Sequence, residues 1–174
     1  MPNDTSFSPR TAALSGSVAS RAGRRGERQR QRIVLMVGLP GSGKSTYLER
    51  LGVMPLSSDA VRQLLADDAT DQTIHERVFA TLRYLLRQRL AIGRAVTYLD
   101  ATHLTPGERR PYIKIARQYG CDVEAVFFDV PLEICIARNR GRERVVPVEA
   151  MRKMAAKLVP PKEAEGFRRV TVMR

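Results

Sequence analysis

The sequence predicts an α/β domain whose central parallel sheet of about five strands is covered by helices on both faces. Three observations support this fold class. Short apolar runs alternate with longer stretches of helical periodicity along the chain. The apolar runs are continuous, which is typical of strands buried on both faces. Glycine and proline separate the two kinds of segment, as they do at helix ends.

In the first half of the domain, the apolar run 33–37 predicts a buried strand, and a glycine-rich turn follows it. A helix is expected over 44–51, a short strand over 53–56, and a second helix from about residue 59. Apolar residues then recur at helical spacing and predict a long amphipathic helix, which Gly93 ends. These residues are Ile74, Val78, Leu82, Leu85, Leu86 and Leu90.

The second half continues the same alternation. Proline begins each of its helices and Gly120 closes the first of them, in agreement with the usual positions of these residues at helix ends. The predicted strands are 95–99, 123–128 and 170–173, and the predicted helices are 106–119, 131–139 and 147–158.

Charge divides the chain into two parts. Residues 1–32 contain seven arginines against Asp4 and Glu27, a net charge of +5, so +7 of the total +12 belongs to the rest. The first part has no apolar periodicity and is expected to be a disordered basic tail, whereas 33–174 forms the folded domain. The basic domain favours polyanionic partners, ATP at least and nucleic acid as well. An arginine-rich composition without such a meaning is the alternative.

Other classes of protein are disfavoured by what the sequence contains. No apolar run approaches the roughly 18 residues of a membrane span, and there is no secretory signal. Cys121 and Cys135 stand 14 positions apart without a histidine cluster, so neither zinc nor a redox motif is indicated. We therefore expect a soluble cytoplasmic protein with no membrane contact, and we predict no obligate protein partner.

The glycine-rich turn at 38–45 fits the phosphate-binding pattern G-x-x-x-x-G-K-[ST] at every fixed position. Its glycines allow successive backbone N–H groups to converge on a phosphate at the positive end of the following helix. Lys44 is expected to neutralise β- and γ-phosphate oxygens of a purine nucleoside triphosphate, and the Ser45 hydroxyl to bind Mg²⁺. The predicted nucleotide-binding residues of this loop are Gly38, Gly41, Ser42, Gly43, Lys44, Ser45 and Thr46.

A carboxylate follows the second predicted strand. Because strand ends at the carboxyl edge of a parallel sheet face the ligand crevice, Asp59 should point toward the γ-phosphate. There it could accept the proton of an attacking hydroxyl, as kinases require. Arg62, one turn along the helix, could bind a phosphate of the acceptor. The alternative is that Ser58 or Asp59 only caps the helix.

A second carboxylate, Asp100, ends the third predicted strand. It either holds Mg²⁺ through water or binds the acceptor, while an N-cap role for Asp100 or Thr102 is the competing account. His103 is a further proton acceptor in principle, but a lone histidine more often packs or lies in solvent.

The segment 138–144 carries four arginines between two predicted helices. Guanidinium groups suit the charge on a phosphoryl group in transfer, and a mobile lid can bring them in. A solvated run of charges is the ordinary alternative.

Taken together, these segments resemble the P-loop polynucleotide 5′-hydroxyl kinase family over 33–174. The segments that carry the resemblance are GLPGSGKST at 38–46, SSDAVR at 57–62, DAT at 100–102, PGERR at 106–110, FFDVPLEICIARNRGR at 127–142, VPVEAMRKM at 146–154 and EGFRRV at 165–170. The P-loop is shared by many families, whereas the combination of S-S-D-x-x-R with C-x-x-R-N-x-x-R and V-P is much more specific. One departure is His103, where that family usually has asparagine.

The resemblance implies roles for single residues. Asp59 would be the general base on a 5′-hydroxyl, and Arg62 would contact the adjacent acceptor phosphate. Asp100 would lie at the acceptor site, Arg142 would reach the donor phosphates, and Arg138 would lie against the adenine. P-loop kinases also imply the strand order 2-3-1-4-5 and an arginine-rich lid.

Three functions are therefore carried forward. The leading hypothesis is an ATP-dependent phosphotransferase that acts on 5′-hydroxyl ends of RNA or DNA. The alternative is a P-loop kinase of a small-molecule hydroxyl, which an enclosed pocket rather than an open basic groove would favour. The third is a nucleotide-binding regulatory module without acceptor chemistry.

Overall fold

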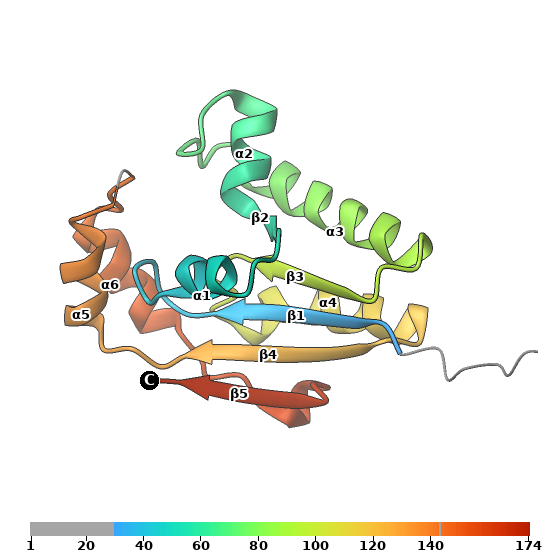
Figure 1. Cartoon of the computed structure of the whole chain (residues 1–174). Helices are drawn as coiled ribbons and strands as arrows, with labels where there is room; N and C mark the ends of the chain where they lie inside the picture. The colour runs from blue at the N-terminus through green and yellow to red at the C-terminus, as the bar shows by residue number, and fades with distance from the viewer. Residues whose placement is uncertain (1–29, 143) are drawn as a thin grey trace, which may run out of the picture.

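The computed structural model describes residues 30–142 and 144–174 as one α/β domain (Figure 1). The tail predicted at 1–32 falls, up to residue 29, outside the described residues. The strands are β1 Arg32–Val37, β2 Leu56–Ser57, β3 Val96–Asp100, β4 Asp122–Phe128 and β5 Arg169–Met173. The helices are α1 Lys44–Arg50, α2 Ser58–Ala66, α3 His75–Ala91, α4 Pro106–Tyr119, α5 Leu132–Asn139, α6 Val148–Lys157 and the 3₁₀ turn η1 Glu163–Glu165.

The five strands form one parallel sheet in the order β2-β3-β1-β4-β5, which confirms the predicted fold and strand order. β1 lies in the centre, where Leu35 is aligned with Leu99 of β3 and Ala125 of β4. All three side chains are almost completely buried. The apolar run of β1 is continuous because a central parallel strand has no face toward water.

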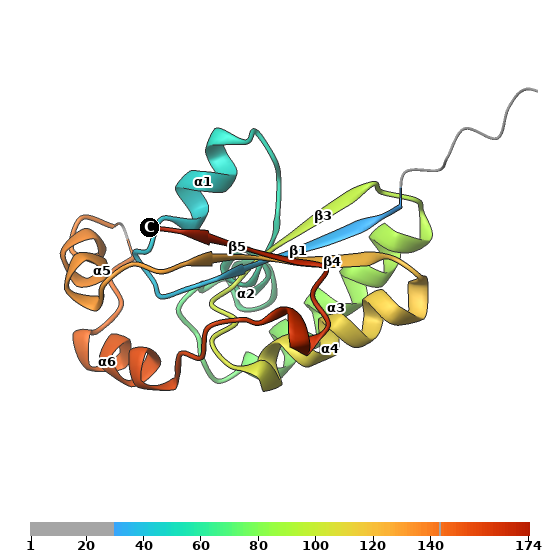
Figure 2. The same cartoon turned by 90° about the horizontal axis from the view of Figure 1, so that it is seen from below.

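Helices cover both faces of the sheet, although unequally. Figure 2 shows α1 alone on one side and α3 with α4 on the other. Leu48 of α1 packs on Met36 and Phe128 of the first face. The opposite face holds the larger core, where Leu86 of α3 and Ile115 of α4 pack against the strands. The helices α5 and α6 lie beyond the carboxyl ends of the strands (Figure 1).

The second strand differs from its predicted position. It was expected at 53–56 and is found at Leu56–Ser57. The Val53 amide donates instead to the carbonyl oxygen of Leu48, which closes the end of α1, and Pro55 has no N–H to offer a sheet. Val53 is apolar because it packs beneath α1, so its hydrophobicity does not mark a strand.

One arginine is completely buried and connects distant parts of the chain. The guanidinium of Arg109, on α4, donates to the backbone oxygens of His103, Leu104 and Val159 at 2.9, 3.2 and 3.0 Å. It also forms a two-point ion pair with Glu165, at 2.9 and 2.7 Å. Arg109 thereby joins the loop after β3 to the C-terminal segment.

Replacement of this arginine should destabilise the fold. Arg109→Met leaves a carboxylate and three carbonyl oxygens without their donor, and we expect a loss of about 3–5 kcal/mol in the free energy of unfolding. Urea denaturation followed by circular dichroism measures it. The neighbouring Arg110 is exposed, so Arg110→Met is the matched control, with a change within about 0.5 kcal/mol. Equal effects of the two substitutions would contradict the role of Arg109.

Among the described residues, no helix has both the length and the apolar character needed to cross a membrane.

Candidate active site

The phosphate-binding loop follows β1 at the carboxyl edge of the sheet and opens directly into α1. Gly43 occupies the N-cap of α1 at φ 103°, and Gly41 has φ 79°, so both stand in conformations that favour glycine. A Cβ on Gly41 would also lie 2.4 Å from the carbonyl oxygen of Cys135 in α5. The close approach of α5 to the loop therefore requires glycine at this position.

Lys44 is buried against the loop that precedes it. Its ammonium donates to the backbone oxygens of Gly38 and Leu39 at 2.9 and 2.7 Å, and to Ser42 Oγ at 3.4 Å. Burial lowers the pKa of Lys44 to about 8, an effect that Arg142 strengthens and the carboxylate of Asp100 opposes. Lys44 therefore carries its positive charge at pH values below about 8.

The predicted use of ATP should have a pH dependence that is set by this lysine. Below its pKa of about 8 the ammonium is present, and above it the group loses the charge that binds phosphate oxygens. We expect kcat/KM for ATP to fall by roughly tenfold per pH unit above that value, since this parameter reports ionisations of the free enzyme. Initial rates between pH 6 and 10 measure the effect. A flat profile up to pH 10 would contradict it.

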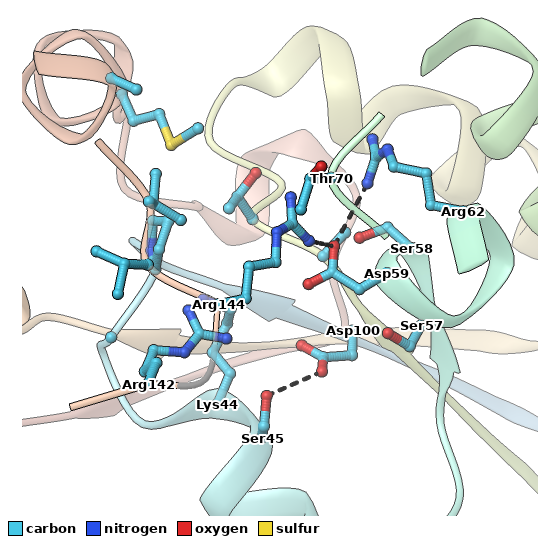
Figure 3. Close-up of a pocket in the computed structure, with 18 of the residues that line it drawn as sticks. Lys44, Ser45, Ser57, Ser58, Asp59, Arg62, Thr70, Asp100, Arg142 and Arg144 are labelled. Atoms are coloured by element: carbon cyan, nitrogen blue, oxygen red, sulfur yellow. Dashed lines mark hydrogen bonds and ion pairs between the residues drawn. The ribbon is translucent and has the colours of Figure 1, made fainter. Parts of the chain in front are cut away.

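Ser45 and Asp100 come together at the beginning of α1. The Ser45 hydroxyl lies 3.2 Å from Oδ2 of Asp100, which ends β3 (Figure 3). Burial raises the pKa of Asp100, and the positive charge of Lys44 opposes the rise. Two oxygen ligands fit Mg²⁺, which uses one or two protein oxygens together with water and phosphate. Asp100 contacts the loop rather than Asp59 or Arg62, so its position favours the metal alternative over the acceptor role.

The second carboxylate, Asp59, lies near the beginning of α2 and is held by two arginines. Its Oδ1 lies 2.7 Å from Arg144 and 3.4 Å from Arg62, and the Asp59 side chain is about half exposed (Figure 3). The N-cap of α2 is Ser57, whose hydroxyl accepts from the Ala60 amide. The capping alternative for Ser58 or Asp59 was therefore wrong, and the carboxylate of Asp59 lines the cavity.

The basic connector predicted as a lid is described except for residue 143. Arg138, Arg142 and Arg144 all line the cavity. Asn139 is buried and holds the two ends of this turn together: its amide donates to the Val146 oxygen at 2.8 Å and accepts from the Val146 amide at 3.1 Å. The arginines therefore come from a turn whose base is fixed.

The lysine, the two carboxylates and the arginines described so far share one cavity of about 1130 Å³. The loop contributes Lys44 and Ser45, the strands contribute Asp100, α2 contributes Asp59 and Arg62, and the lid contributes its arginines. Arg138 also lines a second hollow of about 380 Å³, together with Ser42, Phe128, Pro131 and Met173. Every residue predicted for catalysis, metal and acceptor lines the larger cavity.

Two sequence hypotheses about the loop after β3 can now be decided. The N-cap of α4 is Thr105, whose hydroxyl accepts from the Glu108 amide, so Asp100 and Thr102 do not cap this helix. His103 is buried and its Nδ1 lies 2.8 Å from the Met36 oxygen, at a φ of 47°. Burial lowers its pKa to about 4. His103 thus packs in the core as a neutral ring.

Sequence reasoning did not find several residues of the cavity. Arg144 was seen only as part of a basic run, and its ion pair with Asp59 has no local signal. The turn between α2 and α3 and the first turns of α3 also line the cavity, through Thr70, Gln72, His75 and Phe79. These residues belong to no sequence motif. The packing of α2 on α3 brings them to the site.

Comparison with known families decides the relationship of the chain. The family model described as an AAA domain matches residues 33–161. The chain belongs to this AAA-domain family. Its sheet order and its phosphate-binding loop are those of a P-loop kinase fold.

Individual relatives of this AAA-domain chain are distant. L-seryl-tRNA(Sec) kinase of Methanococcus maripaludis is 21% identical over 136 residues, which cover 74% of this chain and about half (53%) of that protein. One chain in a structure of the Pnkp1/Rnl/Hen1 RNA repair complex is similar to this chain, with a TM-score of 0.63 and 22% identity. The match covers 75% of this chain and 44% of the chain in that complex. The structure of a sugar kinase from Janibacter sp. HTCC2649 has a TM-score of 0.59 and 19% identity to this chain. The match covers 83% of this chain and 84% of the sugar kinase. These structures establish the fold and leave the acceptor open.

Proposed function

We propose that this chain is an ATP- and Mg²⁺-dependent kinase that transfers the γ-phosphoryl group to the 5′-hydroxyl end of RNA or DNA. The observation that carries the proposal is the position of Asp59. It lines the same cavity as the phosphate-binding loop, on a different element, between two arginines. A nucleotide-binding module without acceptor chemistry has no need of this arrangement.

In the reaction, the acceptor hydroxyl oxygen forms a bond to the γ-phosphorus, and the bond between this phosphorus and the β–γ bridging oxygen breaks. ADP leaves, and the hydroxyl proton passes to the Asp59 carboxylate. Arg62 holds the phosphate next to the attacking hydroxyl, while Lys44 and Arg142 offset charge on the transferred group. Arg144 must leave part of Asp59 accessible, since its guanidinium occupies one oxygen in this structure.

The donor is accommodated between the loop and the lid. Mg²⁺, held through Ser45 and Asp100, would offset negative charge on the β- and γ-phosphates. The smaller hollow beside Arg138 is the place for the purine, with the guanidinium against the base. This position agrees with the role that the family resemblance implies for Arg138.

Charge and shape of the cavity support a polymeric acceptor. Six basic side chains line it against the two carboxylates Asp59 and Asp100. The basic side chains are Lys44, Arg50, Arg62, Arg138, Arg142 and Arg144. Several lining residues are exposed, among them Gln72, His75 and Val145, so the cavity opens to solvent as a groove.

The second candidate is a kinase of a small-molecule hydroxyl. It is favoured by the likeness to the sugar kinase, which extends over 84% of that chain, whereas only 44% of the chain in the RNA repair complex is matched.

A competition assay separates the two acceptors. The protein is incubated with γ-labelled ATP, Mg²⁺, a 5′-hydroxyl oligonucleotide and a panel of sugars and other small alcohols at equal concentration. We expect label on the oligonucleotide, and none on the same oligonucleotide with a 5′-phosphate. Label on a small alcohol alone would replace the proposal by the second candidate.

A further inference from the structure

We propose that His75 and Phe79 form a stacking platform for the nucleobase at the 5′ end of the acceptor. The inference rests on the proposed function and adds to it the part of the acceptor that is recognised. The platform lies outside the segments that carry the family resemblance.

The two rings stand one turn apart at the beginning of α3. Their centroids are 4.6 Å apart with an angle of 41° between the planes, so the rings lie one against the other. Phe79 is half-buried and packs with Ile74, Val78 and Leu82 between α2 and α3, whereas His75 is exposed. The phenyl ring thus fixes the position of the platform, and the imidazole extends it into the cavity that both line.

The platform continues one wall of the groove. This wall begins at Asp59, continues through Arg62 one helical turn further along α2, and includes Thr70 and Gln72 of the following turn. Figure 3 shows Thr70 on the same side of the cavity as Asp59 and Arg62. An acceptor with its hydroxyl at Asp59 and its adjacent phosphate at Arg62 has its first base attached to the same sugar. The aromatic rings are the groups of this wall that can stack on that base.

Stacking suits the chemistry of a nucleic acid end. Every base has a π face, so an aromatic platform binds an end without choosing its sequence. The polar groups of the cavity would bind phosphate in a sugar phosphate equally well, and an aromatic ring can also lie against the C–H face of a sugar. The contribution of the base itself is therefore measured by comparing a complete end with an abasic one.

Apart from Tyr47 of α1, whose ring packs edge-on against Phe128, the cavity offers one rival surface for the base. Val145 and Met154, on the lid side, are also apolar and line the same space. A base that lay against the lid would leave the aromatic pair without a function. The experiment has to compare the two walls.

The test uses two oligonucleotides, one complete and one whose 5′-terminal nucleoside is abasic but keeps its 5′-hydroxyl. His75→Ala and Phe79→Leu remove the rings, and leucine retains apolar packing between α2 and α3. Tyr84→Leu changes an exposed aromatic residue of the same helix outside the cavity and is the matched control. Val145→Ala tests the lid wall. kcat/KM is measured for each acceptor, and KM for ATP separately.

We expect the abasic end to lower kcat/KM of the unmodified protein by about tenfold. His75→Ala and Phe79→Leu should lower it by a similar factor on the complete end and cause little further loss on the abasic end, with KM for ATP unchanged. Tyr84→Leu and Val145→Ala should have no such effect. Full activity of both ring variants, or a base-dependent loss in Val145→Ala alone, would overturn the platform while the proposed function stands. No label on any oligonucleotide would overturn both.

Discussion

Replacement of Lys44 by alanine is expected to lower kcat/KM for ATP by about 10²- to 10³-fold, the range found when one group that stabilises transition-state charge is removed. The lysine is buried at the start of α1, and its ammonium lies among the loop oxygens of Gly38 and Leu39. No other cationic side chain comes from the loop itself, since Arg138 and Arg142 reach the cavity from the lid. Steady-state rates with varied ATP measure the loss.

The control for this substitution is stability. Alanine retains the helical conformation of α1, and the desolvation of a buried ammonium no longer opposes folding. We therefore expect Lys44→Ala to have a thermal unfolding midpoint within a few degrees of the original. Normal turnover in a folded Lys44→Ala protein would contradict the assignment of the P-loop as the donor site.

Asp59→Asn should lower kcat by about 10²- to 10⁴-fold, the usual contribution of a general base, with little change in KM for ATP. The amide keeps the shape of the carboxylate but cannot take up the hydroxyl proton. It also removes the negative charge that binds Arg62 and Arg144. Single-turnover transfer to a 5′-hydroxyl oligonucleotide measures the chemical step.

Asp67→Asn is the matched control for this variant. Asp67 is the exposed C-cap of the same helix at φ 54°, a conformation that asparagine also tolerates, and it does not line the cavity. We expect full activity for Asp67→Asn. If the two variants were equally active, Asp59 would not be the base and the acceptor site would have to be sought elsewhere.

The donor side could be predicted from the sequence because its signals are local. A buried strand, a turn with glycines at fixed positions and a helix starting at Lys44 are consecutive in the chain, and each has its own pattern.

The predicted helix 106–119 also has the same ends as α4, since Pro106 and Gly120 mark both of them.

The acceptor side depended on tertiary structure and was predicted only in part. Asp59 was found because a carboxylate after a parallel strand faces the crevice. Arg144 could not be paired with it, because the ion pair joins residues 85 positions apart across the groove. His75 and Phe79 have the spacing of an ordinary helix face, and only the packing of α2 on α3 turns this face toward the site.

Buried polar residues were the least predictable. Arg109 lies in a helix rich in charged residues, and nothing in the local sequence distinguishes it from the exposed Arg110. Asn139 stands inside the basic run that suggested a lid, but its two hydrogen bonds depend on the return of the chain at Val146. Both residues satisfy backbone groups that a sequence pattern cannot locate.

Mass spectrometry of the acceptor after reaction with ATP and Mg²⁺ tests the central claim most directly. A single-stranded oligonucleotide with a 5′-hydroxyl should gain the mass of one phosphoryl group, and fragmentation should place it on the 5′-terminal nucleoside, with one ADP formed for each group transferred. An oligonucleotide of unchanged mass, in a reaction that still forms ADP or phosphorylates a small alcohol, would contradict the assignment of this groove to nucleic acid ends.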